Sequence, residues 1–360
     1  MPAISLLDVP NVAQPASEPG FPGHAVFVTR RGGPEVLRLA ERTVSVPGPD
    51  EIVVKVRAAG VAPGDVVLRE GLRGDVPAPM IPGYDAAGLV IATGTNVADV
   101  HLGDHVAVRT VDGTGGYATH VRAPSEGAAV YPAHLPPESV TSLVLDYMTA
   151  LQLLTRAAPI AGGSTILVHA AAGGIGTALL QLGRLRGLRM FGAASAGNAS
   201  LVESHGATPI DDRNEEYLER VRAEYPDGFD AVFDGAGGPA WKHGLGLLRP
   251  GGHLVLYGMS SGFTSGRRDL LGIPSGVTRA PRTSYFKYIS KSLGGTGTSS
   301  SILIPSRHDW FQHDLAHLIG LLDDGKIAPA VQEMFPLESA RDAHHALGTG
   351  RVTGKLVLIP

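Results

Sequence analysis

The stretch HAAAGGIGTALLQLGRLRG, residues 169–187, decides the fold expected for this chain. A β-rich run ends at its first residues, glycines follow at once, and an apolar helix is expected from about Thr177. Gly173 and Gly174 let the backbone come close to a pyrophosphate, and Gly176 lets the helix pack closely on the sheet. The N–H groups and the dipole of the helix N-terminus would then face the phosphate charge. The stretch therefore predicts a dinucleotide site.

Strands and helices alternate after this stretch. The β-rich runs LRMFGAA, ATPI, FDAVFD and GHLVLYG are separated by segments in which apolar residues recur at helical spacing. After Gly262 the sequence is irregular, with one possible strand over Leu293–Ile304. Such alternation is typical of a parallel sheet with helices on both faces. We therefore expect an α/β, doubly wound domain over residues 141–305, entered through a helix over residues 138–158.

The preceding part of the chain has a different pattern. Between His24 and Tyr131, glycine and proline turns separate the strand-like runs HAVFVT, EIVVKVRAAGV, AAGLVIATG, DHVAVRT and GYATHVRA. They predict a compact, mostly antiparallel β domain. The helical run DWFQHDLAHLIGLLDDG and the final strand GKLVLIP are expected to return to it, so that it comprises residues 23–140 and 306–360. Residues 1–22, rich in proline and small side chains, are expected to form a flexible tail.

The composition excludes several classes of protein. The chain has 360 residues, 43% of them hydrophobic and 18% charged, which suits two globular domains. It has no cysteine, so it forms no disulfide, thiolate zinc site or cysteine nucleophile, which fits a reducing cytoplasm. The net charge of −4 is spread without basic blocks, so no nucleic-acid partner is expected. No run of about 18 apolar residues occurs, so no membrane partner is expected either.

The choice of cofactor depends on the end of the second strand of the doubly wound sheet. NAD sites usually have a carboxylate there, which accepts a hydrogen bond from a ribose hydroxyl. This chain has AASAGN instead and no carboxylate before Glu203, so nothing repels a 2′-phosphate. Ser195 and Asn198 can donate hydrogen bonds to such a phosphate, and Arg213 could reach the same corner. NADP(H) is therefore the expected cofactor.

The order of several motifs resembles a known family. They are GGPEVLRLAE, PGPDEIVVKVRAAGVAPGD, IPGYDAAGLVIATG, HLGDHVAV, GGYATHV, AAAGGIGTALLQL, FDAVFDGAGG, LRPGGHLVLYG and TGKLVL. Together they are similar to the zeta-crystallin-like quinone oxidoreductases, in the quinone and enoyl reductase branch of the medium-chain dehydrogenase/reductase superfamily. The resemblance implies a GroES-like catalytic domain, a Rossmann domain inserted into it, and a homodimer in which Leu293–Ile304 is an edge strand. It also implies NADPH-dependent hydride transfer to a small quinone or to the C=C bond of an enone.

The resemblance also implies roles for individual residues. It places cofactor contacts at Thr149, Ala170, Gly173, Gly174, Ile175, Gly176, Tyr257 and Gly258, with Ser195, Asn198 and Arg213 at the positions that read the phosphate. Zinc-dependent relatives have Cys, His and often Glu around a catalytic metal. Here Ala62, Tyr84 and Asp85 hold those positions, and the four-cysteine lobe is absent, which predicts a metal-free enzyme.

Reduction of an enone also needs a proton, and three residues are candidates to supply or position it. Tyr84 and Tyr147 are the available tyrosine candidates, although most tyrosines merely pack. Asp65 follows Ala62-Pro63 in its motif, although a residue in such a place often caps a turn. Many related reductases have Asn-Pro where this chain has Ala-Pro, and some have a tyrosine donor where it has Leu72-Arg73.

Other interpretations remain open at this point. The chain could bind NADPH without turnover or in redox-neutral chemistry. Gly258-Met259-Ser260-Ser261-Gly262 fits the G-x-S-x-G pattern of a serine hydrolase, but a nucleophilic Ser260 would need a helix directly after it. His313 and His317 lie one helical turn apart, a spacing that can hold zinc, yet no third ligand follows, so solvent-facing histidines are expected.

Overall fold

The computed structural model describes residues 19–72, 76–158, 160–211, 216–237, 240–258, 288–290, 298–301 and 310–360. The chain divides into two compact units. The first combines Met1–Leu145 with Ser306–Pro360, and the second is Asp146–Pro305. The sequence analysis put the first boundary at residue 140, ahead of the position that the structure gives it.

The first unit is built on a mostly antiparallel sheet. Its strands are β3 (Glu51–Val61), β4 (Asp85–Thr93), β5 (His105–Arg109), β6 (His120–Pro124), β7 (Ala128–Val130), β15 (Val331–Pro336) and β16 (Lys355–Ile359). Their order is β15-β16-β3-β4-β5-β7, with β6 also paired to β3, and only the β15–β16 pair is parallel. Because β3 is buried along nearly its whole length, its β-branched residues fill the core between neighbouring strands. The expected GroES-like β domain is confirmed.

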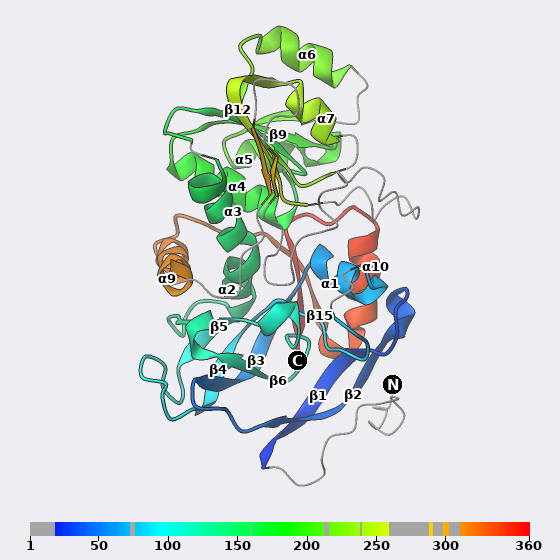
Figure 1. The fold of residues 1–360 in the computed structure, drawn as a ribbon, viewed down its shortest axis with the longest axis vertical. Coiled ribbons are helices and arrows are strands. Elements are labelled where there is room, and N and C mark those ends of the chain that lie inside the picture. Colours follow the sequence, from blue (N-terminus) through cyan, green and yellow to red (C-terminus); the bar gives the residue numbers. More distant parts are fainter. Residues whose placement is uncertain are drawn as a thin grey trace. The chain divides into compact units, whose positions relative to one another are not determined.

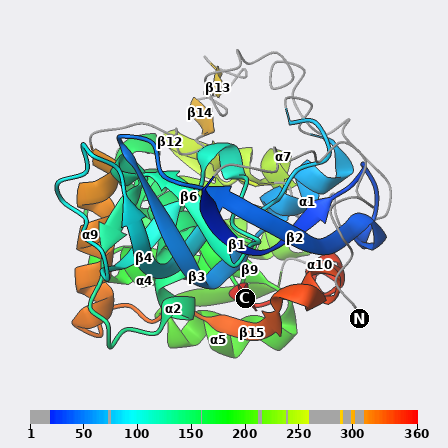
Figure 2. The same cartoon turned by 90° about the horizontal axis from the view of Figure 1, so that it is seen from below.

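A two-stranded ribbon accompanies this sheet (Figure 2). β1 (Gly20–Val28) pairs antiparallel with β2 (Leu37–Ser45) from one end to the other. Residues 20–22, expected in the flexible tail, therefore belong to a strand. Residues 1–18 lie outside the described part of the chain. β2 was not predicted, because charged residues interrupt its apolar positions.

Two helices of the first unit were not predicted, although they matter for the site. α1 (Pro63–Glu70) starts with a proline in its first turn and ends at Gly71, whose φ of +72° favours glycine. α10 (Ala340–Gly348) lies beside α1 in the fold although the two are far apart in sequence (Figure 1), and Arg69 of α1 contacts His344 of α10. The helix α9 (Trp310–Asp323) was predicted, and its Gln312 amide donates hydrogen bonds to two backbone carbonyls ahead of β7 and at its start.

The single helix expected over residues 138–158 is interrupted. It consists of α2 (Pro137–Ser142), a π-helical turn at Leu143–Tyr147, α3 (Met148–Gln152) and a second π-helical turn at Leu153–Ala157. Apolar side chains at helical spacing predicted its length, but they do not report a change from i+4 to i+5 hydrogen bonding. The unit boundary falls within the first π turn.

The second unit contains the expected Rossmann sheet. The strands are β8 (Thr165–His169), β9 (Arg189–Ala194), β10 (Thr208–Asp211), β11 (Phe229–Asp234), β12 (Leu248–Leu256), β13 (Tyr288–Ser290) and β14 (Thr298–Ser301). Their order is β10-β9-β8-β11-β12-β14-β13, parallel except at the β13–β14 pair. The helices between them are α4 (Gly174–Leu185), α5 (Ala199–Ser204), α6 (Tyr217–Glu224) and α7 (Ala240–Leu245). The doubly wound fold is confirmed.

Two features of this sheet bear on earlier expectations. The chain moves outward from β8 through β9 to β10, and then from β11 through β12 on the other side, so the order reverses between β8 and β11. Right-handed crossovers then place helices of the two halves on opposite faces. The expected edge strand at Leu293–Ile304 is corrected, because β14 lies between β12 and β13, and β13 forms the described edge.

Candidate functional site

The glycine turn after β8 has the geometry of a phosphate-binding turn. β8 ends at His169, Ala170 takes a positive φ of 55°, and α4 begins at Gly174, three residues earlier than the expected start at Thr177. Gly173 is the N-cap residue and has no side chain to cap the helix, and the carboxylate of Asp146 lies against the next residue, Gly174. The helix therefore presents its first backbone N–H groups and its positive dipole end to an anion.

The space around each glycine shows which of them is needed for close packing of the helix and which has an open side that a phosphate could approach. A Cβ atom on Gly176 would lie 2.7 Å from the Cα of Ala171 and closer still to the carbonyl oxygen of Ala170. Gly176 is therefore required for the fold of the turn itself. A Cβ atom on Gly173 would meet only the carbonyl oxygen of Ala170, at 3.4 Å. Within the protein, Gly173 thus has room for a side chain, and its side of the turn is partly exposed.

The last residues of β8 and β11 flank the point where the strand order reverses. Ligands of doubly wound sheets bind outside the carboxyl ends of the strands at this point. His169 and Asp234 are register partners there, both buried, with Nδ1 of the imidazole 3.6 Å from a carboxylate oxygen. That oxygen also accepts hydrogen bonds from the N–H groups of Ala236 and Gly237, at 2.8 and 3.0 Å.

Tyr257 lies at the same edge of the sheet. Its hydroxyl donates a hydrogen bond of 3.1 Å to the carbonyl oxygen of His169, at the root of the glycine turn. Its ring lies against Gly235, where a Cβ atom would meet it at 2.6 Å. Burial, and next the charge of Asp234, raise the pKa of Tyr257, so it remains a neutral donor. Gly258 follows directly, whereas Ser260 lies outside the described residues.

The residues expected to read the phosphate lie after β9, beside the glycine turn in the sheet order. Ser195 and Asn198 are partly exposed around a single 3-10 turn (Ala196–Asn198), and the Asn198 amide donates to the Ser195 hydroxyl at 3.3 Å. Arg213, the third residue of this set, lies outside the described part of the chain. Thr149, expected near the nicotinamide, is buried on α3.

Tyr84 is held between two glycines of the first unit. A Cβ atom on Gly64, in the first turn of α1, would lie 2.7 Å from its ring, and a Cβ atom on Gly113 would clash with the ring from a second segment. Gly113 has a φ of +73° and ends a short 3-10 turn. The backbone of Tyr84 accepts a hydrogen bond of 3.0 Å from Thr110 N–H. Among the three predicted proton-handling residues, Tyr84 is the one whose side chain is partly exposed.

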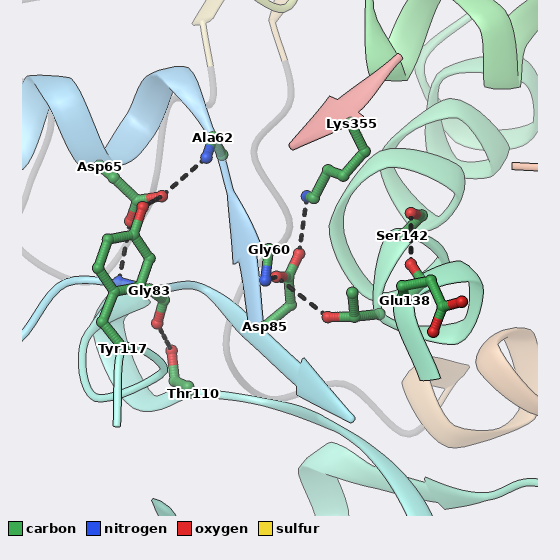
Figure 3. A network of polar contacts seen from close by, with 11 residues as sticks. Gly60, Ala62, Asp65, Gly83, Asp85, Thr110, Tyr117, Glu138, Ser142 and Lys355 are labelled. Atoms are coloured by element: carbon green, nitrogen blue, oxygen red, sulfur yellow. Dashed lines mark hydrogen bonds and ion pairs between the residues drawn. The ribbon is translucent and has the colours of Figure 1, made fainter. Parts of the chain in front are cut away.

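Asp65 is fully buried and acts on the backbone (Figure 3). Its carboxylate accepts hydrogen bonds from Ala62 N–H at 2.8 Å, Gly83 N–H at 2.9 Å and the Tyr117 hydroxyl at 3.1 Å. Burial raises the pKa of Asp65 to about 7, against the opposing hydrogen bond from Ala62. Asp65 therefore holds the start of α1 and the loop before β4, in keeping with the capping role that its motif also allowed. Tyr147 is likewise buried, and burial raises its pKa.

A second buried network surrounds Asp85, the residue after Tyr84. Lys355 Nζ lies 3.0 Å from a carboxylate oxygen of Asp85, and both side chains are at most 3% exposed. The other oxygen accepts hydrogen bonds from Gly60 N–H at 2.8 Å and from the Thr141 hydroxyl at 3.3 Å. Figure 3 shows that this network ties β4, β3, β16 and α2 together.

Sequence reasoning missed five side chains of these networks: Arg69, Tyr117, Thr141, His344 and Lys355. Arg69 Nη1 and His344 Nδ1 are 3.0 Å apart, and His344 Nε2 and the Tyr117 hydroxyl are 3.0 Å apart. Burial, and next the positive charge of Arg69, lower the pKa of His344 to about 3. These residues are far apart in sequence, and no local pattern shows that they are buried together.

The shifted pKa values of Asp65 and His344 should affect the pH dependence of the free energy of unfolding in opposite directions. Asp65 has a folded pKa of about 7 against an ordinary 3.8, so its contribution to stability is lost as pH rises through this interval. His344 has a folded pKa of about 3 against 6.5, so its contribution is lost as pH falls from 6.5. We expect Asp65→Asn to make the slope of unfolding free energy against pH more positive than in the unsubstituted protein. The change should be at most about 1.4 kcal/mol per pH unit.

His344→Gln should make the same slope more negative by a similar amount. Urea unfolding at several pH values between about 4.5 and 6 measures both slopes. In this interval each of the two groups has different protonation in the folded and the unfolded state. Slope changes of the same sign in the two variants would contradict the assignment.

No three His, Cys, Asp or Glu side chains lie close enough to hold a metal ion in the described part of the chain. His313 is an exposed residue of α9 beside Asp314, and His317 is also exposed, as expected for solvent-facing histidines.

Across the described ranges, no helix has the length and apolar character needed to cross a membrane.

Comparisons with known proteins agree with this architecture. The family model described as alcohol dehydrogenase GroES-like domain matches residues 48–133, and the model described as zinc-binding dehydrogenase matches residues 205–358. A quinone oxidoreductase of Pseudomonas aeruginosa is 32% identical over 336 residues, covering 91% of this chain and 97% of the relative. The synaptic vesicle membrane protein VAT-1 homolog of Rattus norvegicus is 30% identical over 344 residues, covering 94% and 84%.

Solved structures give the same result. The Escherichia coli quinone oxidoreductase complexed with NADPH superposes with a TM-score of 0.81 at 27% identity, covering 94% of this chain and all of that one. Fold, glycine turn and matched domains together define a two-domain oxidoreductase with a GroES-like and a Rossmann domain. The chain belongs to the medium-chain dehydrogenase/reductase superfamily, in its quinone oxidoreductase branch. The resemblance seen in the sequence is thereby confirmed.

Proposed function

We propose that this protein is a zinc-independent, cytoplasmic reductase that uses NADPH to reduce a small quinone or the C=C bond of an enone. The observation that carries the proposal is the glycine turn at residues 170–176, where α4 begins after an N-cap glycine that has no side chain and has room around it. When bound, NADPH supplies a hydride, and the protein supplies binding, orientation and a proton. A homodimer, as the family resemblance implies, is part of the same proposal.

The residues present fit a dinucleotide. Gly173, Gly174 and Ile175 would border the pyrophosphate with backbone N–H groups, and Gly176 keeps α4 close to the sheet. Tyr257, pinned to the carbonyl of His169, would bound the site at the strand-order reversal. The complex of the Escherichia coli relative with NADPH supports the same choice of cofactor.

The donor set does not fit a catalytic zinc ion. The chain has no cysteine, and Ala62 offers no ligand atom. Tyr84 is confined between Gly64 and Gly113, and the Asp85 carboxylate is engaged by Lys355. The zinc-binding description of the matched family model therefore does not extend to these side chains, and the carbonyl must be polarised by hydrogen-bond donors.

Selectivity for NADPH is proposed to depend on Ser195. Ser195→Asp would add a carboxylate where NAD sites have one, so it should repel a 2′-phosphate and accept from a ribose hydroxyl. We expect the Kd for NADPH to rise about tenfold or more and the preference to shift toward NADH. Calorimetry with both cofactors measures this. Ser204→Asp, an exposed position on α5, adds the same charge and should leave both affinities unchanged. An unchanged preference in Ser195→Asp would place the phosphate elsewhere.

Tyr84 is proposed as the proton donor or carbonyl hydrogen-bond donor. Its ring is fixed on two sides by glycines and it is partly exposed, whereas Tyr147 and Asp65 are buried. Tyr84→Phe removes the hydroxyl alone, so kcat should fall about a hundredfold while NADPH affinity is retained. Tyr225→Phe, which removes the hydroxyl of a tyrosine beyond α6, serves as the control. A large loss in Tyr147→Phe with none in Tyr84→Phe would transfer the role to Tyr147.

The decisive experiment combines binding and turnover. Calorimetry with NADPH and NADH tests uptake, and loss of the reduced-nicotinamide absorbance with a panel of quinones and enones tests catalysis. The proposal requires both NADPH uptake and turnover of at least one substrate class. Folded protein that takes up neither cofactor would refute it. Uptake without turnover across the panel would favour a protein that binds NADPH without reductase activity.

A further inference from the structure

Three hydrogen bonds in series link Arg69, His344, Tyr117 and Asp65, and one turn of α1 between Asp65 and Arg69 completes the ring. Asp65 and Arg69 are one helical turn apart on α1 and therefore share a face. Arg69 can only donate, so Nδ1 of His344 accepts from it at 3.0 Å and the ring proton is on Nε2. Nε2 then donates to the Tyr117 oxygen at 3.0 Å, and the Tyr117 hydroxyl donates to Asp65 at 3.1 Å. The direction of each bond is thus set by the guanidinium.

The four side chains of the ring are almost completely shielded from solvent. Asp65, Arg69, Tyr117 and His344 are each at most 3% exposed. The rings of Tyr117 and His344 also pack edge to face, with centroids 5.7 Å apart. In such surroundings, removal of one partner leaves a buried polar group without a hydrogen bond. The loss of free energy is therefore larger than for a contact at the surface.

The ring holds the backbone segments that surround Tyr84 in place. The other hydrogen bonds that Asp65 accepts come from Gly83 N–H, the residue before Tyr84, and from Ala62 N–H, at the start of α1. Gly64 of that same helix turn lies against the Tyr84 ring. The backbone before Tyr84 and one wall of its side-chain site are therefore both fixed by a single carboxylate. That carboxylate is oriented by Tyr117, and Tyr117 by His344.

We propose that His344 and Tyr117 are positioning residues for the Tyr84 phenol, acting through Asp65 on the Gly83 backbone and on α1. This inference rests on the proposed function for its effect on turnover, but not for its effect on structure. Neither His344 nor Tyr117 touches the reacting atoms. A displacement of the phenol by a fraction of an ångström to about 1 Å is enough to reduce turnover tenfold or more.

The first test reads the position of Tyr84 without any substrate. Protein labelled with 3-fluorotyrosine gives a fluorine NMR resonance for Tyr84, assigned by its loss in Tyr84→Phe. In His344→Leu, which removes both ring nitrogens, this resonance should shift or broaden. In His344→Gln, whose amide can accept from Arg69 and donate to Tyr117, it should return toward its original position. His345→Leu, at the exposed neighbouring position of α10, is the matched control and should leave it unchanged.

The second test is a double-mutant cycle in turnover. His344→Leu should lower kcat about tenfold with NADPH affinity unchanged, and His344→Gln should restore most of it. In the Tyr84→Phe background, His344→Leu should have no further effect, because the group that it positions is gone. Independent, multiplicative losses would overturn the inference.

The two tests also separate this inference from the proposed function. An unchanged Tyr84 resonance in folded His344→Leu overturns the positioning role, whatever the turnover. A shifted resonance rescued by glutamine, in a protein that reduces no substrate, supports the positioning role while the reductase proposal fails. Should His344→Leu not fold, Tyr117→Phe removes one hydroxyl with nearly the same volume, and the same outcomes apply to it.

Discussion

Replacement of Lys355 by methionine is expected to lower the free energy of unfolding by about 3–5 kcal/mol. Lys355 and Asp85 form an ion pair of 3.0 Å in which the two side chains are 3% and 1% exposed. Methionine keeps most of the side-chain volume but leaves the Asp85 carboxylate buried without its cation. The hydrogen bonds from Gly60 and Thr141 remain, yet they cannot neutralise a full charge in the core.

The control for this prediction is an ion pair of similar length at the surface. Lys326 Nζ lies 2.9 Å from Asp324, with the side chains 54% and 59% exposed. Because solvent screens such a pair, Lys326→Met should change stability by less than about 1 kcal/mol. Urea unfolding of both variants gives the comparison. Equal effects in the two would mean that burial contributes nothing to the Lys355 pair.

A second substitution tests the origin of the loss. The double variant Lys355→Met with Asp85→Asn removes the uncompensated charge and retains an oxygen that can accept from Gly60 N–H. Its stability should recover most of the loss, because the cost comes from an unpaired buried charge and not from the absence of the pair. Failure to recover would point to lost packing of the lysine side chain instead.

The predictable parts of the fold are those in which the signal is local. FDAVFD predicted β11 over its full length, because a central parallel strand is buried at all its positions but one here, and glycines bound the run on both sides. EIVVKVRAAGV predicted β3 for a similar reason. The structure of the glycine turn was predicted, since a strand, glycines and a helix follow one another within a few residues, and its contact with a cofactor stays a prediction.

The parts that were missed depend on contacts between distant segments. α1 is short, begins at a proline and carries two charged residues at its end, so its eight residues show no helical period of useful length. β15 and α10 are formed by polar sequences whose partners, β16 and α1, are supplied by other parts of the chain. His344 and Tyr117 are separated by 227 positions, and nothing local distinguishes His344 from the exposed His345 beside it.

The candidate site shows the same division. Ser195, Asn198 and the glycines could be proposed from sequence because each expected role depends on position within a local strand–turn–helix unit, and these roles stay predictions. The proposal of Tyr84 over Tyr147 and Asp65 could not be made from sequence, because it depends on how exposed each side chain is. The phenol of Tyr84 is partly exposed, whereas the phenol of Tyr147 and the carboxylate of Asp65 are buried. The exposure of a side chain is set by packing with residues that are distant in sequence.

The largest effect on cofactor binding is expected for Gly173→Ala. Its Cβ atom would meet only the Ala170 carbonyl, at 3.4 Å, and its φ of −76° suits alanine, so the protein has room for the new methyl group. Loss of glycine at the N-cap should cost at most about 1 kcal/mol of stability. The methyl group would, however, point to where the pyrophosphate approaches the backbone. NADPH affinity should therefore fall about a hundredfold, equal to about 2.7 kcal/mol, as measured by calorimetry.

Substitutions of two other glycines serve as controls for the loss of NADPH affinity in Gly173→Ala. In Gly176→Ala the new Cβ would press on the backbone of Ala170 and Ala171, so the variant should lose several kcal/mol of stability before cofactor binding is considered. Gly320, on α9, has no atom within 4 Å of its Cβ position, so Gly320→Ala should leave affinity unchanged. Affinity loss with retained stability in Gly173→Ala alone is the pattern expected of a phosphate approaching the open side of the turn. Unchanged affinity in that variant would mean that no phosphate passes there, and the proposed cofactor site would have to be abandoned.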